Sequence, residues 1–366
     1  MLHGRCPKII VFALAGVGAA FVGGLAVHLM MIRPGPRTAL SDQSPLPKAK
    51  PRVLFVDSYH EGYPRSDDIT QGVLKVFRVG RTADGGLDDR ASKVQLQIIR
   101  MDTRRNPSEE SKAEAGRKVK AVVDFWKPDV VLCADDGAAA HVIVPFFRNT
   151  GPPVVFCGIP WDASGYGLPC RNVTGMVEVS LIPDLLKTMR AQARGERIGL
   201  LGARNETNLQ EARTYAKRFH LDFAQTVFVD DFRQWKAAYL DLQEKVDMLV
   251  LLPPSFLADD PAARTEQAEA RRLVLERTRI PTGSVEGWIA PYSLVCFAKK
   301  ASEQGEWAAR TALGILAGKP PATIPVAANR AATVYLNMPL ARKMGVRFPV
   351  ELIERATLMI EEEHGH

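Results

Sequence analysis

Short runs rich in Val, Ile and Leu alternate with helix-forming stretches twice along this chain, and no other feature constrains its fold as much. Strands that alternate with helices of about 10–15 residues predict parallel sheets whose two faces are both covered by helices. We therefore predict an α/β protein with two similar lobes, each a parallel sheet with helices on both faces and each about the size of an ordinary domain. The runs that we interpret as strands are 52–56, 93–101, 130–134 and 154–157 in the first series, and 198–201, 225–229, 248–252 and 281–285 in the second.

The residues after the second series are too few to form a core of their own. A helical stretch at 301–316 is followed by Gly318-Lys319-Pro320, which is a typical helix stop signal. Two short extended segments at 324–327 and 333–336 come next, and a final helix is predicted at 350–362. We expect these elements to complete the two lobes.

The N-terminal residues have the composition of an export segment followed by a linker. Residues 1–8 are basic, residues 9–32 contain a single ionisable side chain, and residues 33–51 are rich in Pro and Ser. Because about 20 apolar residues span the hydrocarbon core of a membrane, we predict a cytoplasmic segment, a transmembrane signal anchor and a linker over these three ranges. A cleaved signal peptide is the alternative, because Gly24-Leu25-Ala26 is similar to the small-residue exit of such peptides.

An N-terminal export segment usually delivers the residues that follow it to the outside. We therefore expect the globular part on the periplasmic side of the inner membrane, anchored there by the N-terminal helix. If the segment is cleaved, the same part is secreted into the periplasm.

Composition excludes several other classes of protein. The formal charge of +7 is basic, but Lys and Arg are interspersed with Asp and Glu, so no nucleic-acid partner is expected. One apolar run cannot build a multi-span channel or transporter. Five cysteines without a C-x-x-C pair exclude a disulfide-framework fold. Cys133 and Cys157 fall on predicted strands, Cys170 and Cys296 on loops, and a Cys157–Cys170 bridge is a minority alternative.

The chain lacks the motifs of several common enzyme classes. His60-Glu61 is not followed by a second His four residues after the first, so the helical zinc motif is absent. Residues 314–319 lack the spacing and the hydroxyl of a P-loop, and no G-x-S-x-G nucleophile elbow occurs. We therefore expect no enzymatic activity, no catalytic residues, no metal and no cofactor.

Several runs, in order along the chain, resemble one family. The run VLFVDSYHEGYP at 53–64, followed by Ser66-Asp67-Asp68-Ile69, is similar to the opening of the ABC-transporter substrate-binding-protein family of type I periplasmic binding fold. The most similar branch is also used as extracytoplasmic sensor domains. One departure is the stretch 288–297, which lacks the glycine-rich hinge segment of the family. Within the resemblance, which covers 51–348, the other matching runs are 127–131, 134–136, 153–159, 172–175, 317–320, 324–326 and 340–346.

This resemblance implies a clamshell in which the chain crosses between the lobes three times. The crossings would lie at 172–177, 286–294 and 318–326. The first lobe would then consist of 52–171 and 293–318, and the second lobe of 172–292 and 319–362.

The resemblance also implies a function. It implies an extracytoplasmic solute-binding protein of an ABC-type uptake system, which closes on its solute by hinge motion and is then recognised by an ABC permease in the inner membrane. The alternative is a membrane-anchored sensory protein that signals through a partner chain. An α/β enzyme on the same scaffold is a third, less favoured class, because fold alone does not decide function.

We expect the solute site where the strands end, because ligands of open parallel sheets bind beyond the carboxyl ends of the strands. The aromatic rings, hydroxyls and charges found there suit a small polar or aromatic solute. Structural alternatives exist: Asp135 could be a helix N-cap, Tyr59 and Tyr63 could pack the loop, and Trp161 could be a lid residue. The candidates are Ser58, Tyr59, His60, Tyr63, Asp135, Asp136, Gly158, Ile159 and Trp161 in the first lobe, and Arg204, Asn205, Pro254, Ser255, Glu286 and Trp288 in the second.

Overall fold

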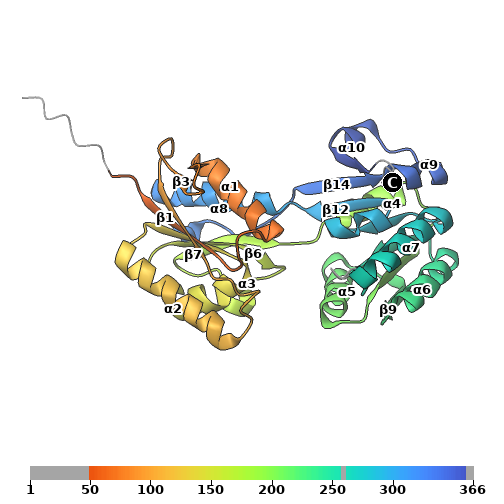
Figure 1. Cartoon of the computed structure of the whole chain (residues 1–366), viewed down its shortest axis with the longest axis horizontal. Helices are drawn as coiled ribbons and strands as arrows, with labels where there is room; N and C mark the ends of the chain where they lie inside the picture. The colour runs from red at the N-terminus through yellow and green to blue at the C-terminus, as the bar shows by residue number, and fades with distance from the viewer. Residues whose placement is uncertain (1–48, 257–260, 360–366) are drawn as a thin grey trace, which may run out of the picture. The chain divides into compact units, whose positions relative to one another are not determined.

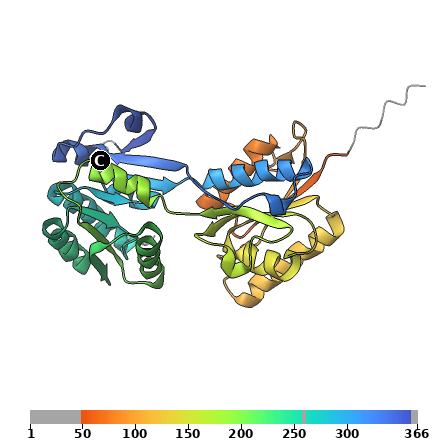
Figure 2. The same cartoon turned by 180° about the vertical axis from the view of Figure 1, so that it is seen from behind.

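The computed structural model describes residues 49–256 and 261–359, which Figures 1 and 2 show from opposite sides. The predicted signal anchor at 9–32 lies outside these described residues, together with residues 1–8 and most of the predicted linker. Within the described ranges, no helix combines the length and the apolar character needed to cross a membrane. The described chain contains two large sheets with separate hydrophobic clusters.

The first sheet has six strands, and all neighbouring strands pair in parallel. In spatial order they are β13 (Ala327–Ala328), β7 (Val173–Glu178), β6 (Val154–Pro160), β5 (Val130–Ala134), β1 (Arg52–Asp57) and β4 (Gln95–Arg100). In β1, Val53 and Phe55 belong to one hydrophobic cluster, whereas Leu54 and Val56 belong to another. Because side chains alternate between the faces of a strand, this division shows that both faces of the sheet are buried.

Helices cover both faces of the first sheet, as Figure 1 shows. The cluster of Val53 and Phe55 includes residues of α1 (Pro64–Phe77) and α8 (Ala301–Leu316). The opposite cluster includes residues of α2 (Glu109–Trp126), α3 (Asp135–Ala138) and the π-helix η1 (Ala139–Phe147). We call this sheet, its helices, the 3-10 turns η2 (Ser164–Tyr166) and η4 (Pro321–Thr323), and the small hairpin of β2 (Gly80–Arg81) and β3 (Leu87–Asp88) the first lobe.

The second sheet has seven strands and is parallel except for one pair. In spatial order they are β15 (Ala356–Met359), β14 (Ala332–Asn337), β12 (Val295–Lys299), β11 (Thr282–Ser284), β10 (Met248–Leu251), β8 (Ile198–Ala203) and β9 (Phe223–Val229). The exception is β14, which is antiparallel to β12 although we predicted a parallel sheet. The reason is that β12 leads out of this sheet and β14 leads back into it at the same place, where Lys299 pairs with Ala332.

Helices pack on the second sheet to form the second lobe. Among them, α4 contacts β11 and β12, and α6 contacts β8 and β9. The C-terminal region differs from the prediction, which was one helix over 350–362. In the structure α10 stops at Glu354, and the strand β15 follows it. Here Ala356 pairs with Val334 of β14, so strand pairing at the sheet edge replaces the last helical turns. The helices are α4 (Ile182–Arg190), α5 (Glu206–Phe219), α6 (Phe232–Lys245), α7 (Pro261–Arg277), the 3-10 helix η3 (Gly287–Tyr292), α9 (Met338–Met344) and α10 (Val350–Glu354).

The chain passes between the two sheets three times, and each passage comes later than we predicted. The crossings follow β7, β12 and β13, at 178–182, 299–301 and 328–332. As a result, β7 and β13 lie in the first sheet and β12 lies in the second, opposite to the lobes predicted for them. In each case the strand pairs with its neighbour along its whole length, which satisfies its backbone groups, and the chain crosses only after the last paired residue.

Side chains tie the crossing segments to one another. The Asn329 amide oxygen accepts from the Val179 N–H at 2.6 Å, and its nitrogen donates to the Val179 carbonyl at 3.1 Å. The Glu303 carboxylate, on the first turn of α8, accepts from the N–H groups of Arg330 and Ala331 at 3.1 and 2.8 Å. The first crossing is therefore bonded to the third, and the third to the helix that follows the second.

The four cysteines in the described ranges are free thiols. Cys157 belongs to the hydrophobic cluster under α1 and α8, whereas Cys170 packs against the cluster on the opposite face of the first sheet. The sheet separates the two sulfur atoms, so the Cys157–Cys170 bridge is absent.

Two glycines allow α1 and α8 to touch through their backbones. A Cβ atom on Gly72 would lie 2.2 Å from the carbonyl oxygen of Ser302, and one on Gly305 would lie 2.0 Å from that of Ile69. Both distances are far shorter than real Cβ contacts, and the obstructing atoms are backbone atoms that cannot move aside alone. The close packing of α8 on the first lobe therefore depends on glycine at both positions.

Replacing Gly305 with Ala should destabilise the protein, because the added methyl group forces α8 away from α1. We expect the free energy of unfolding to fall by roughly 2–3 kcal/mol, as for an overpacked core. Gly314→Ala in the same helix is the matched control, since nothing lies within 4 Å of the Cβ position there. Its free energy of unfolding should rise by about 0.5–1 kcal/mol, because Ala favours the helix more than Gly does. Urea unfolding of both variants measures the difference, and equal stability of the two would contradict this packing.

Candidate functional site

Three strands of the first sheet end side by side. Asp57 at the end of β1 pairs with Ala134 at the end of β5, and Ala134 pairs with Cys157 of β6. The loops that follow these strands therefore meet at one edge, which we call the carboxyl edge of the first lobe. Most of the predicted first-lobe site residues lie on these loops.

Ser58 is buried at this edge and serves the fold. Its hydroxyl donates to the Ala134 carbonyl at 2.6 Å and accepts from the Ala138 N–H at 2.8 Å. It thus connects the end of β1 to the strand–helix junction of β5 and α3. Ile159 is also buried, in the core of the first lobe. Neither side chain is free to contact a solute.

Asp135 lies at the centre of the carboxyl edge. It is 3 % exposed, and its φ of +68° places it in the left-handed region that non-glycine residues rarely adopt. The guanidinium of Arg65, in the first turn of α1, donates from Nη2 to Asp135 Oδ1 at 2.6 Å and to the Gly158 carbonyl at 3.3 Å. The N-cap alternative is wrong, because the cap of α3 is Ala134 and no side chain caps that helix.

Gly158 is required where this pair is formed. Its φ is +77°, and a Cβ atom there would lie 2.6 Å from Asp135 Oδ1 and 3.0 Å from Arg65 Nη2. Any side chain would displace the ion pair. The sequence prediction named Gly158 for its place at a strand end, and the structure gives it this specific role.

The ion pair continues toward the second lobe. Arg65 also binds the carboxylate of Glu178, which is 8 % exposed at the end of β7. Lys299, at the end of β12, lies with Nζ 3.9 Å from Glu178 Oε2 and 2.8 Å from Glu286 Oε1. Charges of alternating sign therefore run from Asp135 to Glu286, past the points where the chain crosses between the sheets. We call these five residues the charge series.

The neighbouring charges set the protonation of the cations in this series. Burial alone would lower the pKa of Lys299, but Glu286, Glu178 and Glu211 together hold it above its ordinary value. Burial likewise opposes the charge on Arg65, and Asp135 and Glu178 more than offset that effect, so its pKa is raised. Both cations therefore keep their charge although they are partly buried.

Sequence reasoning missed Arg65, Glu178 and Lys299. For Arg65 a signal existed in the sequence. A cation in the first turn of a helix interacts unfavourably with the helix dipole, so a nearby anion is expected to compensate for it. Glu178 and Lys299 each end an apolar strand, where a charged residue is ordinary. Only the pairing of the strands brings them together.

Tyrosines surround the acidic side of the edge. The rings of Tyr59 and Tyr63 meet edge to face with centroids 4.9 Å apart, and Tyr166 donates to Asp136 Oδ1 at 2.9 Å. Burial and the charge of Asp135 raise the pKa of Tyr59 to about 12, so its phenol is neutral at physiological pH. His60 lies 5.9 Å from the ring of Tyr63 and completes this aromatic group.

Trp161 packs against the second lobe. It follows β6 with a φ of +58° and packs against α5, with ring centroids 5.8 Å from Tyr215 and 6.0 Å from Phe219. Its Nε1–H donates to Glu211 Oε1 at 2.9 Å. Trp161 therefore packs against a second-lobe helix, as the lid alternative described.

Of the second-lobe candidates, two make local hydrogen bonds, one belongs to the charge series, and the other three are described by their exposure. Arg204 donates to the Phe228 carbonyl at 2.7 Å, and Asn205 caps α5 by accepting from the Asn208 N–H at 2.8 Å, so both serve the local fold. Pro254 is buried, Ser255 is exposed, and Trp288 is 52 % exposed. Glu286 alone of these joins the charge series.

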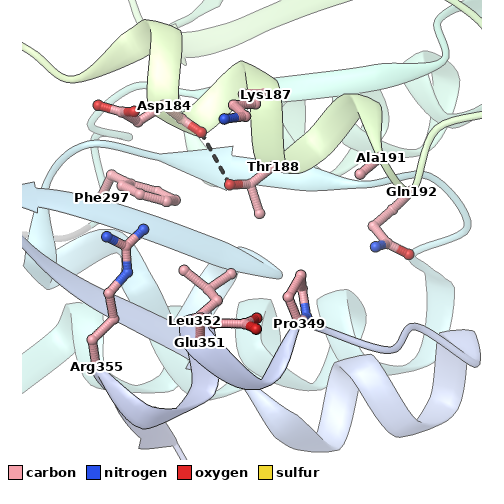
Figure 3. A pocket seen from close by; sticks show the side chains of 10 residues that line it. All are labelled: Asp184, Lys187, Thr188, Ala191, Gln192, Phe297, Pro349, Glu351, Leu352 and Arg355. Carbon is pink, nitrogen blue, oxygen red and sulfur yellow. Dashed lines mark hydrogen bonds between the residues drawn. The ribbon is translucent and has the colours of Figure 1, made fainter.

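Cavities of the described chain lie away from the charge series. One of about 530 Å³ is formed by α4, β12 and α10 of the second lobe (Figure 3), and its polar lining residues include Asp184, Lys187, Glu351 and Arg355. None of the predicted site residues lines it. A smaller cavity of about 270 Å³ is lined by Trp161 and Arg218. We assign the site by its buried charges, because buried polar groups need partners whereas an open groove of solvated side chains does not. Among the described residues, no group of His, Cys, Asp and Glu could hold a metal ion.

Comparisons with known proteins agree on one fold. A family model described as ABC transporter substrate binding protein matches residues 96–360. Among solved structures, the chain is similar to the ligand-free, open form of a substrate binding protein with adhesive properties from Clostridium difficile, with a TM-score of 0.62 and 14% identity over 85% of this chain and 100% of that one. It is also similar to an ABC domain in complex with L-Trp from Streptococcus pneumonia, with a TM-score of 0.51 and 17% identity over 85% and 100% of the two chains. At such identities the likeness shows the fold alone. No curated protein matches the sequence.

Replacing Asp135 with Asn should change how stability depends on pH. Burial raises the pKa of Asp135 to about 6, above its ordinary value of 3.8. The folded state therefore binds more protons than the unfolded state between pH 4 and 6, and this residue lowers the free energy of unfolding as the pH rises through that window, by about 3 kcal/mol.

Urea unfolding at pH 4, 5, 6 and 7 measures this effect. The stability of the wild type minus that of Asp135→Asn should fall by about 2–3 kcal/mol from pH 4 to pH 7. The exposed carboxylate of Asp124 has a pKa lowered by Lys120, so Asp124→Asn should show no such fall. A difference that stays constant with pH would show that Asp135 is not held in a desolvated state.

Proposed function

The chain belongs to the family of ABC transporter substrate-binding proteins, and from this premise we propose that it is an extracytoplasmic solute-binding protein of an ABC-type uptake system. It binds a small polar or aromatic solute beside the carboxyl edges of its two sheets and leaves that solute chemically unchanged. We place it on the periplasmic side of the inner membrane, anchored by residues 9–32, with an ABC permease as its partner.

The charge series supports this proposal more than any other observation. Asp135, Arg65 and Glu178 belong to the first sheet and its helices, and Lys299 and Glu286 belong to the second. Ligands of open parallel sheets bind beyond the carboxyl ends of strands, and the series joins such ends from both sheets. A solute at this position contacts polar groups of both lobes at once.

Closure follows from that double contact. A solute that touches both lobes binds their closed arrangement more tightly, and it shifts the population by the difference in affinity between the two states. The three crossings, bonded together by Asn329 and Glu303, form the hinge about which the lobes move. The permease then recognises the closed form. A sensory protein that signals through a partner chain uses the same step and differs in the membrane protein that recognises it.

A thermal-shift screen of the full-length chain in detergent tests the proposal. The panel contains amino acids, nucleobases, sugars and amides, and a bound solute should add about 2.7 kcal/mol of stability at a hundredfold excess over its dissociation constant. Small-angle scattering should show a smaller radius of gyration with that solute, and mass spectrometry should recover it unaltered. If no solute in the panel raises the melting temperature, or if the solute returns chemically changed, the proposal is wrong.

A further inference from the structure

One oxygen of Asp135 has no partner in the structure. Arg65 binds Oδ1 at 2.6 Å, but Oδ2 is buried and receives no hydrogen bond from any described residue. A buried acceptor without a donor is costly, and most buried polar groups in native proteins are satisfied. Oδ2 can therefore accept a hydrogen bond that the described residues do not supply.

The charge around Asp135 favours a positively charged donor. In this region the described residues place six carboxylates, on Asp57, Asp135, Asp136, Glu178, Glu211 and Glu286, against three partly buried cations, Arg65, Arg100 and Lys299. Arg104 and Arg218 lie on the rim, but both are exposed, and solvent screens their charge. An anionic solute would add to the excess of negative charge, and a cation reduces it.

The aromatic group suits the same ligand chemistry. Tyr59 remains a neutral phenol beside Asp135 because its pKa is raised to about 12. Tyr166 is bonded to Asp136. The ring of Tyr63, which packs against Tyr59, already holds a cation, because the guanidinium carbon of Arg104 lies 4.9 Å from its centroid. The π-faces of tyrosines attract ammonium groups, and the attraction grows when water is excluded. Carboxylates and phenols together are thus a recognition surface for a protonated nitrogen.

We propose that the solute carries a positively charged nitrogen and that Asp135, through its free Oδ2, is the residue that selects for it. This inference rests on the proposed function, because it assigns the class of solute bound at that site. Arg65 is the positioning residue: it holds the carboxylate by Oδ1 and leaves Oδ2 without a hydrogen bond. Neutral and anionic solutes of the same shape bind more weakly, since neither supplies a charge-assisted hydrogen bond.

Matched probes that differ in the charged group test this selection. The indole set is tryptamine and L-tryptophan, which carry the ammonium group, against N-acetyltryptamine and indole-3-propionate, which do not. The second set is choline against 3,3-dimethyl-1-butanol, its neutral isostere. Calorimetry on the full-length wild-type chain should give binding to the ammonium members of at least one set, at least about tenfold tighter than to their uncharged or anionic counterparts. This comparison needs no variant, so it stands even if a substituted protein does not fold.

Variants then assign the selection to Asp135. Asp135→Asn should weaken the binding of the ammonium probe by about tenfold to hundredfold. Asp124→Asn on α2 removes the same charge from an exposed ion pair with Lys120 and should leave that affinity within about twofold.

The outcomes separate this inference from the proposed function. If a neutral or anionic solute binds and its ammonium counterpart does not, or if Asp135→Asn binds the ammonium probe as the wild type does, the inference is wrong and the protein remains a solute-binding protein. If neither the probes nor any member of the larger panel binds, both are wrong.

Discussion

The guanidinium of Arg65 is the contact on which the rest of the site depends. It is partly buried between the buried carboxylates of Asp135 and Glu178, and charges in such a place are stable only when oppositely charged partners replace the hydration that they lose. Taking it away would leave the carboxylate of Asp135 without its cation and the carboxylate of Glu178 with Lys299 alone, at 3.9 Å. The need for a glycine at 158 follows from this arrangement, because a Cβ atom there would lie 2.6 Å from Asp135 Oδ1 and 3.0 Å from Arg65 Nη2.

The two ends of the charge series have different surroundings. At the Asp135 end, the carboxylate is enclosed by the first lobe, and burial raises its pKa to about 6. At the Glu286 end, the carboxylate is partly exposed beside Trp288 in the short helix η3. An ion pair in solvent contributes little, whereas an enclosed one fixes geometry strongly. The Asp135 end of the series is therefore enclosed, whereas solvent reaches the Glu286 end.

Local sequence patterns were sufficient for most strands but not for the sheet to which each belongs. The apolar runs that became β1, β5 and β10 were recognisable because strands buried on both faces carry few polar residues. The runs of β7 and β12 look the same and could pair with either sheet. Neither run was predicted as a strand, because the resemblance implied crossings at 172–177 and 286–294. In the structure β7 pairs with β6 and β12 pairs with β11 before the chain crosses. The antiparallel entry of β14 follows from the same crossings and was missed for the same reason.

The site shows a similar division. Asp135 and Gly158 could be named because strand ends of parallel sheets are where ligands bind, but this rule does not say which side chains point outward. The same rule therefore also named Ser58 and Ile159, whose side chains are buried and serve the fold. Arg65, Glu178 and Lys299 carry no local mark of their importance, apart from the unfavourable helix position of Arg65. Their role exists only once three distant segments of the chain have met.

The late position of α8 in the chain has a consequence for biosynthesis. This helix covers the face of the first sheet that carries Val53 and Phe55, yet its residues follow nearly all of the second lobe in the sequence. While the ribosome is still making residues 52–300, α1 is the helix available to cover that apolar face, and the part that α8 covers stays open. The core on this side of the first lobe is therefore complete only after α8 has emerged.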